Sequence, residues 1–593
     1  MRGSSQEPST FQGSGTGPTP IDRPTDAPPL TRYGTATLVW ARGAVAGPAA
    51  VRCLWQAGYP TRRRHLASSL TVAGSDDREL VAAAVRVHGD EAPSRLEGPL
   101  SWVAWDGSRG RLTAVRDRIG VEPLYYAERG DRVAVGPRPA ELAGALGLSP
   151  SPDPEALAAH LNGHAPPAGR SFFSGVCAVP PGAAVDFERD ATRVRRYWRP
   201  EIPPTLRLGS EAEYAEALRE LLAEVARDHR VDGAAVSMSG GLDSTSVAAM
   251  LRSAAPSAEL VALHRTAPEI EEADESAFAR AAAERLGLRY EAVRVDRHWP
   301  LSSPEGLVTG EDSPLLPPYA EAWQASWSRA RELGVGTVFT GAGGDHLFGG
   351  SRIYPYADLL LRGRWVRLAR EMACHRERFG VGAWAVWRRN LLRPLLRAYL
   401  PRWRPAGRSA APWLGPAGRR HWQRVHGEAM RRDRGYPPLL PARRDRLRFL
   451  TDARISELIG ALARHAGRHG IALRHPLLDP RLFAFALSLP AEQSFSAGAE
   501  KAILRRAMRG ELPDELLDRR DKVFPFAIFH RGLREREVER VRALLTDMRA
   551  ADAELVDPSV LAAAYERYRR GESDGGGLLW SALTLEDWLR RYF

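Results

Sequence analysis

A glycine-rich turn between an apolar strand and a helix constrains this chain more than any other feature of its sequence. The turn reads SGGLDS at residues 239–244 and directly follows the apolar run 234–238. Glycines let backbone N–H groups face an anion, and the start of the following helix adds partial positive charge. Ser239 and Ser244 add hydroxyl donors, and Asp243 is suited to hold Mg²⁺ beside phosphates. The hexapeptide therefore predicts a phosphate-binding loop.

Strands alternate with helices after Pro200, beginning with a helix capped by Ser210. This alternation predicts right-handed βαβ units and a parallel sheet whose strand-end loops share one edge, where ligands bind. From about Tyr354 the chain is predicted to be largely helical. The predicted strands are 234–238, 260–263, 290–295 and 335–340, and the predicted helices are 245–252, 274–286 and 320–333.

The residues before Pro200 have a different pattern. Residues 1–32 are rich in Pro, Ser, Thr and Gly, which predicts a flexible tail. From 33 to 200, short apolar stretches alternate with Gly and Pro turns, and 77–87 is the clearest helix. We therefore expect an α/β protein with a β-rich domain at 33–200 and a second domain at 201–593. A basic helical insert is expected at about 355–445.

Composition excludes several classes of protein. Apolar residues are 44% and charged residues 26%, as in globular proteins. No apolar run approaches the roughly 20 residues that span a bilayer, and no secretory signal is visible, so a cytoplasmic location is predicted. The three cysteines lack CxxC spacing, which favours buried thiols over a zinc site. The net charge of +12 fits an arginine-rich coding bias and does not by itself predict nucleic-acid binding.

A second glycine-rich segment, GAGGDHLFGG at 341–350, follows the predicted strand that ends at Thr340. With the first loop, it resembles the PP-loop ATP pyrophosphatase domain of the asparagine synthetases. That resemblance implies that ATP adenylates a carboxylate and that Asp243 and Asp345, at neighbouring strand ends, hold Mg²⁺. The implied ATP and pyrophosphate contacts are Ser239, Gly240, Gly241, Leu242, Asp243, Ser244, Leu263 and Gly341.

Further motifs towards the C-terminus are similar to the same family. They are HPLLD at 475–479, EKAILR at 500–505 and the run from Leu512-Pro513 to Arg519-Arg520-Asp521-Lys522. The resemblance implies that Lys522 is the catalytic lysine and that Lys501 contacts a phosphate. An ammonium suits oxygens that gain negative charge during adenylation and amide formation.

The N-terminal part resembles the class II glutamine amidotransferase (Ntn) domain of that family. The matching segments are 96–98, 102–106 and 116–126. Those glutaminases use a cysteine that becomes residue one after Met removal, whereas this chain begins Met1-Arg2 and its first cysteine is Cys53. Because arginine cannot replace a thiolate nucleophile, we expect a glutaminase-like scaffold that releases no ammonia.

Another amine must then enter, as in two relatives, the β-lactam synthetases and the lasso peptide cyclases. Asparagine synthetases carry Glu, and β-lactam synthetases Tyr, at the position of Ala342, so the hypothesis is a lasso peptide cyclase. The resemblance implies a precursor peptide, a leader peptidase and a leader-binding protein as partners, with no nucleic acid. A β-lactam synthetase-like ligase, an ammonia-dependent asparagine synthetase-like ligase and an inactive scaffold remain alternatives.

The stretch 362–432 is rich in arginine and holds six tryptophans. Such residues could grip a peptide or a partner protein, because Arg and Trp are favoured anchors. Equally, the stretch could be a helical lid whose tryptophans are core and whose arginines are solvated. The tryptophans are Trp365, Trp384, Trp387, Trp403, Trp413 and Trp422.

Overall fold

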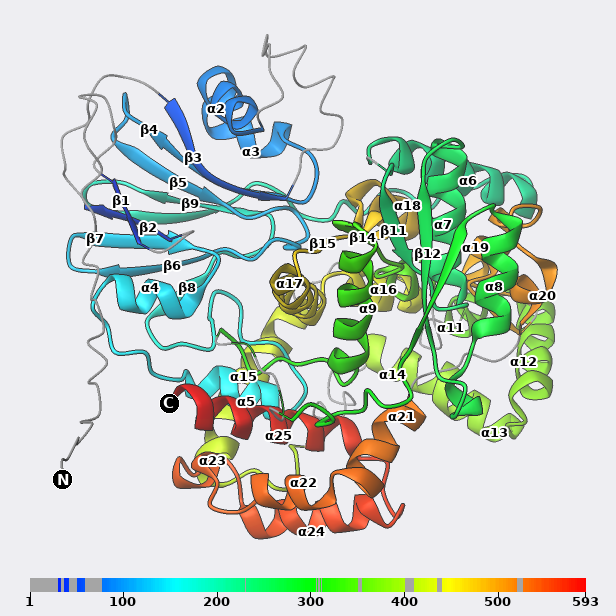
Figure 1. Cartoon of the computed structure of the whole chain (residues 1–593). Helices are drawn as coiled ribbons and strands as arrows, with labels where there is room; N and C mark the ends of the chain where they lie inside the picture. The colour runs from blue at the N-terminus through cyan, green and yellow to red at the C-terminus, as the bar shows by residue number, and fades with distance from the viewer. Residues whose placement is uncertain are drawn as a thin grey trace, which may run out of the picture.

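The computed structural model of the chain has a β-rich half, a half built on a parallel sheet, and a group of C-terminal helices that lies against both (Figure 1). This arrangement confirms the predicted α/β class and its order of domains. The structure describes residues 30–33, 37–41, 51–58, 77–229, 231–304, 307, 310, 312–349, 355–399, 410–434, 440–496, 498–519 and 526–593.

Two antiparallel five-stranded sheets pack face to face in the N-terminal half. Their shared core includes Trp40 and Trp105, whose ring centroids are 5.7 Å apart. Helix α2 (Asp77–His88) packs on the outer face of one sheet, and α4 (Pro139–Ala145) and α5 (Pro154–Leu161) pack on the other. The strand order of the first sheet is β1 (Leu30–Tyr33), β2 (Thr37–Ala41), β7 (Arg132–Gly136), β6 (Tyr125–Arg129), β8 (Val176–Ala178). The strand order of the second sheet is β10 (Thr192–Arg196), β9 (Ala183–Phe187), β5 (Arg111–Val115), β4 (Leu100–Asp106), β3 (Val51–Gly58).

The second half is organised by a parallel sheet with helices on both faces. Strand residues alternate between faces, so Val236 packs in the core with α6, α7 and α8, whereas Ala235 packs with α9 and α17. The sheet order is β13 (Arg289–Arg294), β12 (Leu260–Thr266), β11 (Ala234–Ser237), β14 (Thr337–Phe339), β15 (Ala472–Arg474). The helices are α6 (Glu211–Arg227), α7 (Leu242–Ala254), α8 (Ser276–Arg285), α9 (Ala320–Glu332) and α17 (Ala453–Arg468).

Most predicted elements of this half occur within a few residues of their predicted bounds. Ser210 caps α6 as predicted, because its hydroxyl accepts a hydrogen bond from the N–H of Glu213. Helix α7 begins at Leu242 rather than at Thr245, which places Asp243 in its first turn. Strand β15 was not predicted, because its three residues lie inside a stretch that reads as helical. In the N-terminal half, β1 begins within the last residues of the predicted tail.

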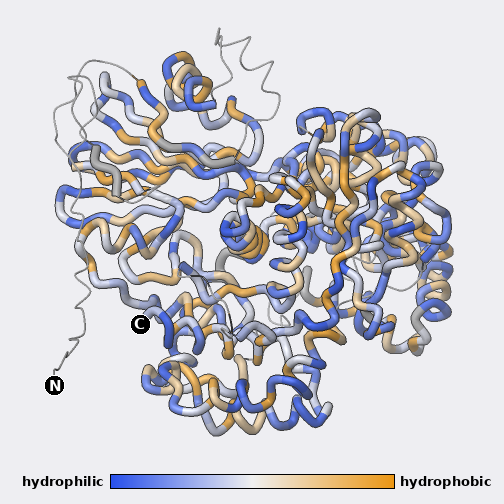
Figure 2. The backbone as a smooth tube through the Cα atoms, viewed as in Figure 1, coloured by the Kyte–Doolittle hydropathy of each residue, from blue (hydrophilic) through white to orange (hydrophobic). Residues whose placement is uncertain are grey.

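The basic insert and the C-terminal helices complete the fold. Trp588 of the last helix packs edge-on against Phe173 of the N-terminal half, with ring centroids 5.6 Å apart. Figure 2 shows apolar residues along the inner strands of both halves. These helices are α11 (Tyr356–Leu361), α12 (Trp365–Phe379), α13 (Ala383–Val386), a π-helical turn (Trp387–Leu392), α14 (Arg393–Tyr399), α15 (Pro416–Arg434), α16 (Pro441–Leu450), α21 (Phe526–Arg531), α22 (Val538–Leu544), α23 (Arg549–Asp552), α24 (Pro558–Arg569) and α25 (Gly576–Tyr592).

The other short elements lie around the carboxyl edge of the parallel sheet or beside α2. They are α3 (Ala92–Arg95), α10 (Gly344–Phe348), α18 (Pro480–Ser488), the hairpin β16 (Phe495–Ser496) and β17 (Ala499–Glu500), α19 (Ala502–Ala507) and α20 (Asp514–Asp518). Among the described residues, we find no helix that is both long and apolar enough to span a membrane.

Candidate active site

The loop after β11 has the geometry predicted for a phosphate-binding turn. Gly240 has φ +73°, and a Cβ at this position would lie 2.8 Å from the carbonyl oxygen of Glu275. Only glycine therefore fits there without strain. The hydroxyls of Ser239 and Ser244 lie 3.1 Å apart and close the loop on itself. The loop leads directly into the N-terminus of α7, which favours an anion.

The second glycine-rich loop touches the first, because β14 pairs with β11 in parallel and both loops leave the same sheet edge. A Cβ on Gly341 would lie 2.6 Å from the backbone nitrogen of Ser244. A Cβ on Gly344 would overlap the side chain of Asp243. These glycines therefore allow the contact that brings Asp243 and Asp345 together, as the sequence predicts.

Lys501 joins these two aspartates. Its Nζ lies 2.6 Å from Oδ2 of Asp243 and 2.7 Å from Oδ1 of Asp345. The lysine side chain is only 8% exposed. Burial by itself would lower the pKa of Lys501, but the two carboxylates raise the pKa above its ordinary value, so the ammonium stays charged. The structure thus places a cation between the two carboxylates.

These carboxylates fit the Mg²⁺ that the resemblance implies. Their oxygens converge on one positive charge, and carboxylate oxygen is a ligand that Mg²⁺ prefers. Within the described part of the chain, no group of three or more His, Cys, Asp or Glu side chains could hold a metal. Water and phosphate oxygens would therefore complete the coordination, as is usual for Mg²⁺.

The C-terminal motifs support this edge of the sheet. His475 Nδ1 lies 2.7 Å from Oγ1 of Thr340, and that hydroxyl accepts a hydrogen bond from the N–H of Ala342. Arg505 donates through Nε to the carbonyl of Glu500 and through Nη1 to that of Arg519. HPLLD therefore supplies His475, which supports the second loop through Thr340, and EKAILR supplies Lys501 and an arginine that binds the backbone of Arg519.

Arg519 and Glu275 form a contact that the sequence did not reveal. Nη1 of Arg519 lies 2.6 Å from Oε1 of Glu275 and 3.5 Å from the carbonyl oxygen of Gly240. The ion pair thus anchors the segment before Lys522 to the first loop. Arg519 lies in the motif run that precedes Lys522, but no spacing pattern in the sequence links it to Glu275.

The roles of Lys522 and Leu263 stay predictions. Lys522 lies outside the described residues, so its catalytic role stays a prediction. The side chain of Leu263 is buried in the core beneath α9, and its carbonyl accepts a hydrogen bond from Met238. Any contact of Leu263 with ATP would therefore have to use its backbone, and this role also stays a prediction.

The N-terminal half holds two of the three cysteines of the chain. Cys53 lies inside strand β3 and Cys177 inside strand β8. Burial raises the pKa of the Cys177 thiol, which disfavours the reactive thiolate. The third cysteine, Cys374, lies in α12 of the second half. No cysteine occurs before residue 53 in the sequence.

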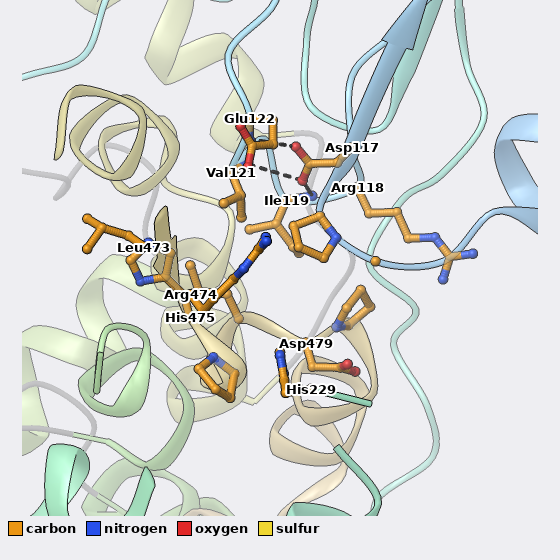
Figure 3. Close-up of a pocket in the computed structure, with 15 residues that line it drawn as sticks. Asp117, Arg118, Ile119, Val121, Glu122, His229, Leu473, Arg474, His475 and Asp479 are labelled. Atoms are coloured by element: carbon orange, nitrogen blue, oxygen red, sulfur yellow. Dashed lines mark hydrogen bonds between the residues drawn. The ribbon is translucent and has the colours of Figure 1, made fainter. Parts of the chain in front are cut away.

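The motif at 116–126 organises a loop at the boundary between the two halves. The Asp117 carboxylate accepts hydrogen bonds from backbone N–H groups of the loop, including those of Gly120 and Glu122. This loop lines a pocket of about 30 Å³, which is room for water (Figure 3). Arg474 and His475 form the opposite wall, on the sheet side (Figure 3).

Comparison with known proteins identifies this combination of loops. The sequence profile of the asparagine synthase family matches residues 217–590, which is more than half of the chain. The chain belongs to the asparagine synthase family. A glutamine amidotransferase domain profile matches residues 59–198. The family that the sequence motifs predicted is therefore confirmed for both halves of this asparagine synthetase-like protein.

Individual relatives show how far the likeness extends. The chain is 27% identical over 548 residues to a Mycobacterium tuberculosis protein provisionally named asparagine synthetase (glutamine-hydrolyzing), covering 87% of this chain and 80% of the relative. It is 24% identical over 451 residues to asparagine synthetase (glutamine-hydrolyzing) 3 of Bacillus subtilis, covering 74% and 68%. Amidase chry2 of Gibberella zeae is 30% identical over 311 residues, covering 49% and 46%.

Proposed function

We propose that this asparagine synthetase-like protein is an AMP-forming ligase that acts as a lasso peptide cyclase. It adenylates the side-chain carboxylate of an Asp or Glu in a precursor peptide and joins it to the N-terminal amine of the same peptide. The observation that carries the ligase is the meeting of Asp243, Asp345 and Lys501 at the end of a phosphate-type loop.

The site supports a two-step reaction. First, a carboxylate oxygen of the peptide attacks the α-phosphorus of ATP, and the bond to the β-phosphate side breaks to release pyrophosphate. Residues 239–244 and the start of α7 bind the departing anion. Bound Mg²⁺, held by Asp243 and Asp345, would neutralise phosphate charge. Next, the amine nitrogen bonds to the acyl carbon, AMP leaves with the electron pair, and the amine loses a proton.

Two features favour an amine other than ammonia from glutamine, and a substrate larger than a single amino acid. The cysteines of the N-terminal half lie within strands, and the Cys177 thiol has a raised pKa. The side chain of Ala342 packs against the core and offers no acid, base or hydrogen-bonding group. A peptide held with its amine against the acyl carbon gains an effective molarity worth roughly 7 to 11 kcal/mol at best.

The proposal includes partners and a location. A leader peptidase would expose the amine of the precursor peptide, and a leader-binding protein would deliver the peptide. The reaction uses ATP and Mg²⁺ and needs no nucleic acid. We expect it to take place in the cytoplasm, where ATP is available.

Incubation of the purified protein with ATP, Mg²⁺ and leaderless candidate peptides tests this function. We expect AMP and pyrophosphate in equal amounts and a peptide product that has lost the mass of one water. Asparagine formed from aspartate and ammonia would instead support the hypothesis of an ammonia-dependent asparagine synthetase-like ligase. Ring closure of a small β-amino acid would support the hypothesis of a β-lactam synthetase-like ligase. ATP that stays uncleaved with every substrate class would support an inactive scaffold.

The paired aspartates give a sharp prediction for the same assay. Asp243→Ala or Asp345→Ala should abolish ATP cleavage to AMP and pyrophosphate, because each change removes a carboxylate from the metal site. Asp514→Ala is the matched control, since that aspartate is 71% exposed and pairs with Arg509 at the surface. Normal AMP formation in either site variant would remove the metal-site assignment.

A further inference from the structure

We infer that Lys501 is a built-in cation that keeps Asp243 and Asp345 converged until Mg²⁺ and ATP bind together. This inference rests on the proposed function of the same site. Its starting point is that Nζ of Lys501 contacts both carboxylates, at 2.6 and 2.7 Å. The ammonium therefore contacts oxygens that a bound Mg²⁺ would need.

The backbone shows that this position is built into the fold. Lys501 has φ +55°, a left-handed conformation that residues other than glycine rarely adopt. Strand β17 ends immediately before it and α19 begins immediately after it. Ile503 and Leu504 anchor α19 in the core with no exposed surface. The chain is thus fixed on both sides of the lysine, and the strained residue is held where its side chain reaches both aspartates.

The charges explain why a cation is needed before the metal arrives. Two carboxylates that face one point in a partly buried site repel each other, and the low local dielectric makes that repulsion stronger than in water. The Asp243 side chain is 17% exposed and that of Asp345 is 40% exposed. One ammonium between them removes the repulsion and keeps both side chains aimed at the metal position.

The same contact makes metal binding depend on the nucleotide. Nζ of Lys501 lies on one oxygen of each carboxylate, and a Mg²⁺ ion this close to a second cation would be repelled by it. We therefore expect Mg²⁺ binding at these oxygens to displace Lys501. The displaced ammonium, whose side chain is 8% exposed in its present position, then needs another anionic partner. The triphosphate of ATP supplies that partner. Mg²⁺ and ATP should therefore bind with positive coupling, each improving the affinity for the other.

The use of lysine at this position agrees with such an exchange. Lys501 and Lys522 are the only lysines in the sequence, although it has 84 lysine and arginine residues in all. An ammonium is a compact charge on a flexible stem, so it can sit between two oxygens and then turn to a third group. A guanidinium is planar and larger, and it favours one fixed bidentate partner.

Binding of Mn²⁺, used in place of Mg²⁺ and followed by electron paramagnetic resonance, tests the inference without any turnover. Nucleotide-free wild-type protein should bind Mn²⁺ weakly. With α,β-methylene-ATP, the affinity of the protein for Mn²⁺ should rise about tenfold or more once the Mn²⁺ held by free nucleotide, measured without protein, is subtracted. Lys501→Met should bind Mn²⁺ without nucleotide about tenfold more tightly than the wild type, because the competing cation is gone. Arg509→Met, which removes a cation that is 54% exposed and pairs with Asp514 at the surface, should match the wild type in the nucleotide-free measurement.

Thermal unfolding gives a second readout. In EDTA, Lys501→Met should have a lower Tm than the wild type, and Mg²⁺ alone should restore it, whereas Mg²⁺ alone should leave the wild-type Tm unchanged. Tight Mn²⁺ binding to the nucleotide-free wild type would overturn the inference but leave the metal site intact. This measurement uses the wild type alone, so it decides the question even if Lys501→Met does not fold. With nucleotide present, a Mn²⁺ signal that is the same with and without each protein would overturn the metal site itself.

Discussion

Lysine is the rare basic residue of this chain, and both examples lie in the C-terminal motif run. Apart from histidine, arginine supplies the other basic side chains, and some of them form surface ion pairs, such as that between Arg509 and Asp514. A sequence this biased towards arginine keeps lysine where a compact, mobile charge is needed. Lysine content alone would thus have pointed to Lys501 and Lys522.

Lys522 provides a prediction at the residue scale. If its ammonium stabilises charge that develops only in the transition state, Lys522→Ala should lower turnover far more than it weakens ATP binding. The expected loss is about 3 to 4 kcal/mol, by analogy with the loss of an oxyanion donor. Lys522→Arg should not restore the rate fully, because the guanidinium is planar and larger. ATP affinity and cyclisation rate are measured in both variants, and equal losses in the two would make Lys522 a ground-state phosphate contact.

The tryptophans of the basic insert divide into two groups at the scale of the element. Trp413 and Trp422 are 4% and 5% exposed and belong to the core that joins α15 to the N-terminal half. Trp365 and Trp384 are 62% and 66% exposed, and Trp384 stacks on Trp387 at the surface. Trp403 lies outside the described residues. Part of the insert is therefore core, and part offers aromatic surface of the kind that anchors partners.

This division predicts different stability effects. Trp413→Ala should lower the free energy of unfolding by about 3 to 5 kcal/mol, because it leaves a large cavity in a packed core. Trp384→Ala, as the matched control from the same insert, should cost less than about 1 kcal/mol, since it loses only a surface stacking contact. Urea unfolding of both variants measures the difference. Similar losses in the two proteins would mean that Trp384 is buried in solution.

At the scale of the whole molecule, the pocket between the halves joins the N-terminal loop to the active-site edge. Glu122 lines this pocket on one side and Arg474 on the other (Figure 3). Desolvation and the neighbouring Asp117 carboxylate raise the pKa of Glu122 to about 7. The carbonyl of Arg474 accepts a hydrogen bond from Thr340, which precedes the second loop. A negative charge on Glu122 would therefore lie across the pocket from Arg474, whose backbone is hydrogen-bonded to the start of the second glycine-rich loop.

The raised pKa makes stability depend on pH. Between the ordinary glutamate pKa of 4.5 and about 7, the unfolded chain has lost this proton while the folded protein retains it. The free energy of unfolding should therefore fall as pH rises through this window. Glu122→Gln should remove the fall and stabilise the protein at pH 8, by roughly 3 kcal/mol at most, with little effect near pH 4.5.

Unfolding of Glu122→Gln and wild type by urea at several pH values checks this expectation. Glu91→Gln is the matched control, because Glu91 lies in the same half and its side chain is 72% exposed. Its pH profile should follow that of the wild type. A Glu122→Gln profile that also follows the wild type would show that Glu122 ionises normally in the folded protein.

The N-terminal half should hold no glutaminase activity. Its two cysteines lie within strands, and the raised pKa of the Cys177 thiol keeps it protonated near neutral pH. We expect no glutamate release from glutamine above background in a coupled assay with the purified protein. Glutamate release that disappears in Cys53→Ala or Cys177→Ala would contradict this prediction.

The sequence by itself determined the fold class, the two loops and the family. These follow from local signals: two glycine-rich segments, apolar runs before them, and a helix after the first loop. Such signals depend on residues that are neighbours in the chain, so no tertiary information is needed. The cap at Ser210 and the helix at 77–87 were predictable for the same reason.

The tertiary structure alone decided which charges meet. Lys501 lies 258 residues after Asp243, and Arg519 lies 244 residues after Glu275. Strand β15, at the edge of the sheet, is too short to show a pattern of its own, and its pairing with β14 comes from the packing around it. Burial of Trp413 and exposure of Trp384 also depend on distant elements. Pairings of this kind arise from how helices pack on the sheet, which local sequence does not encode.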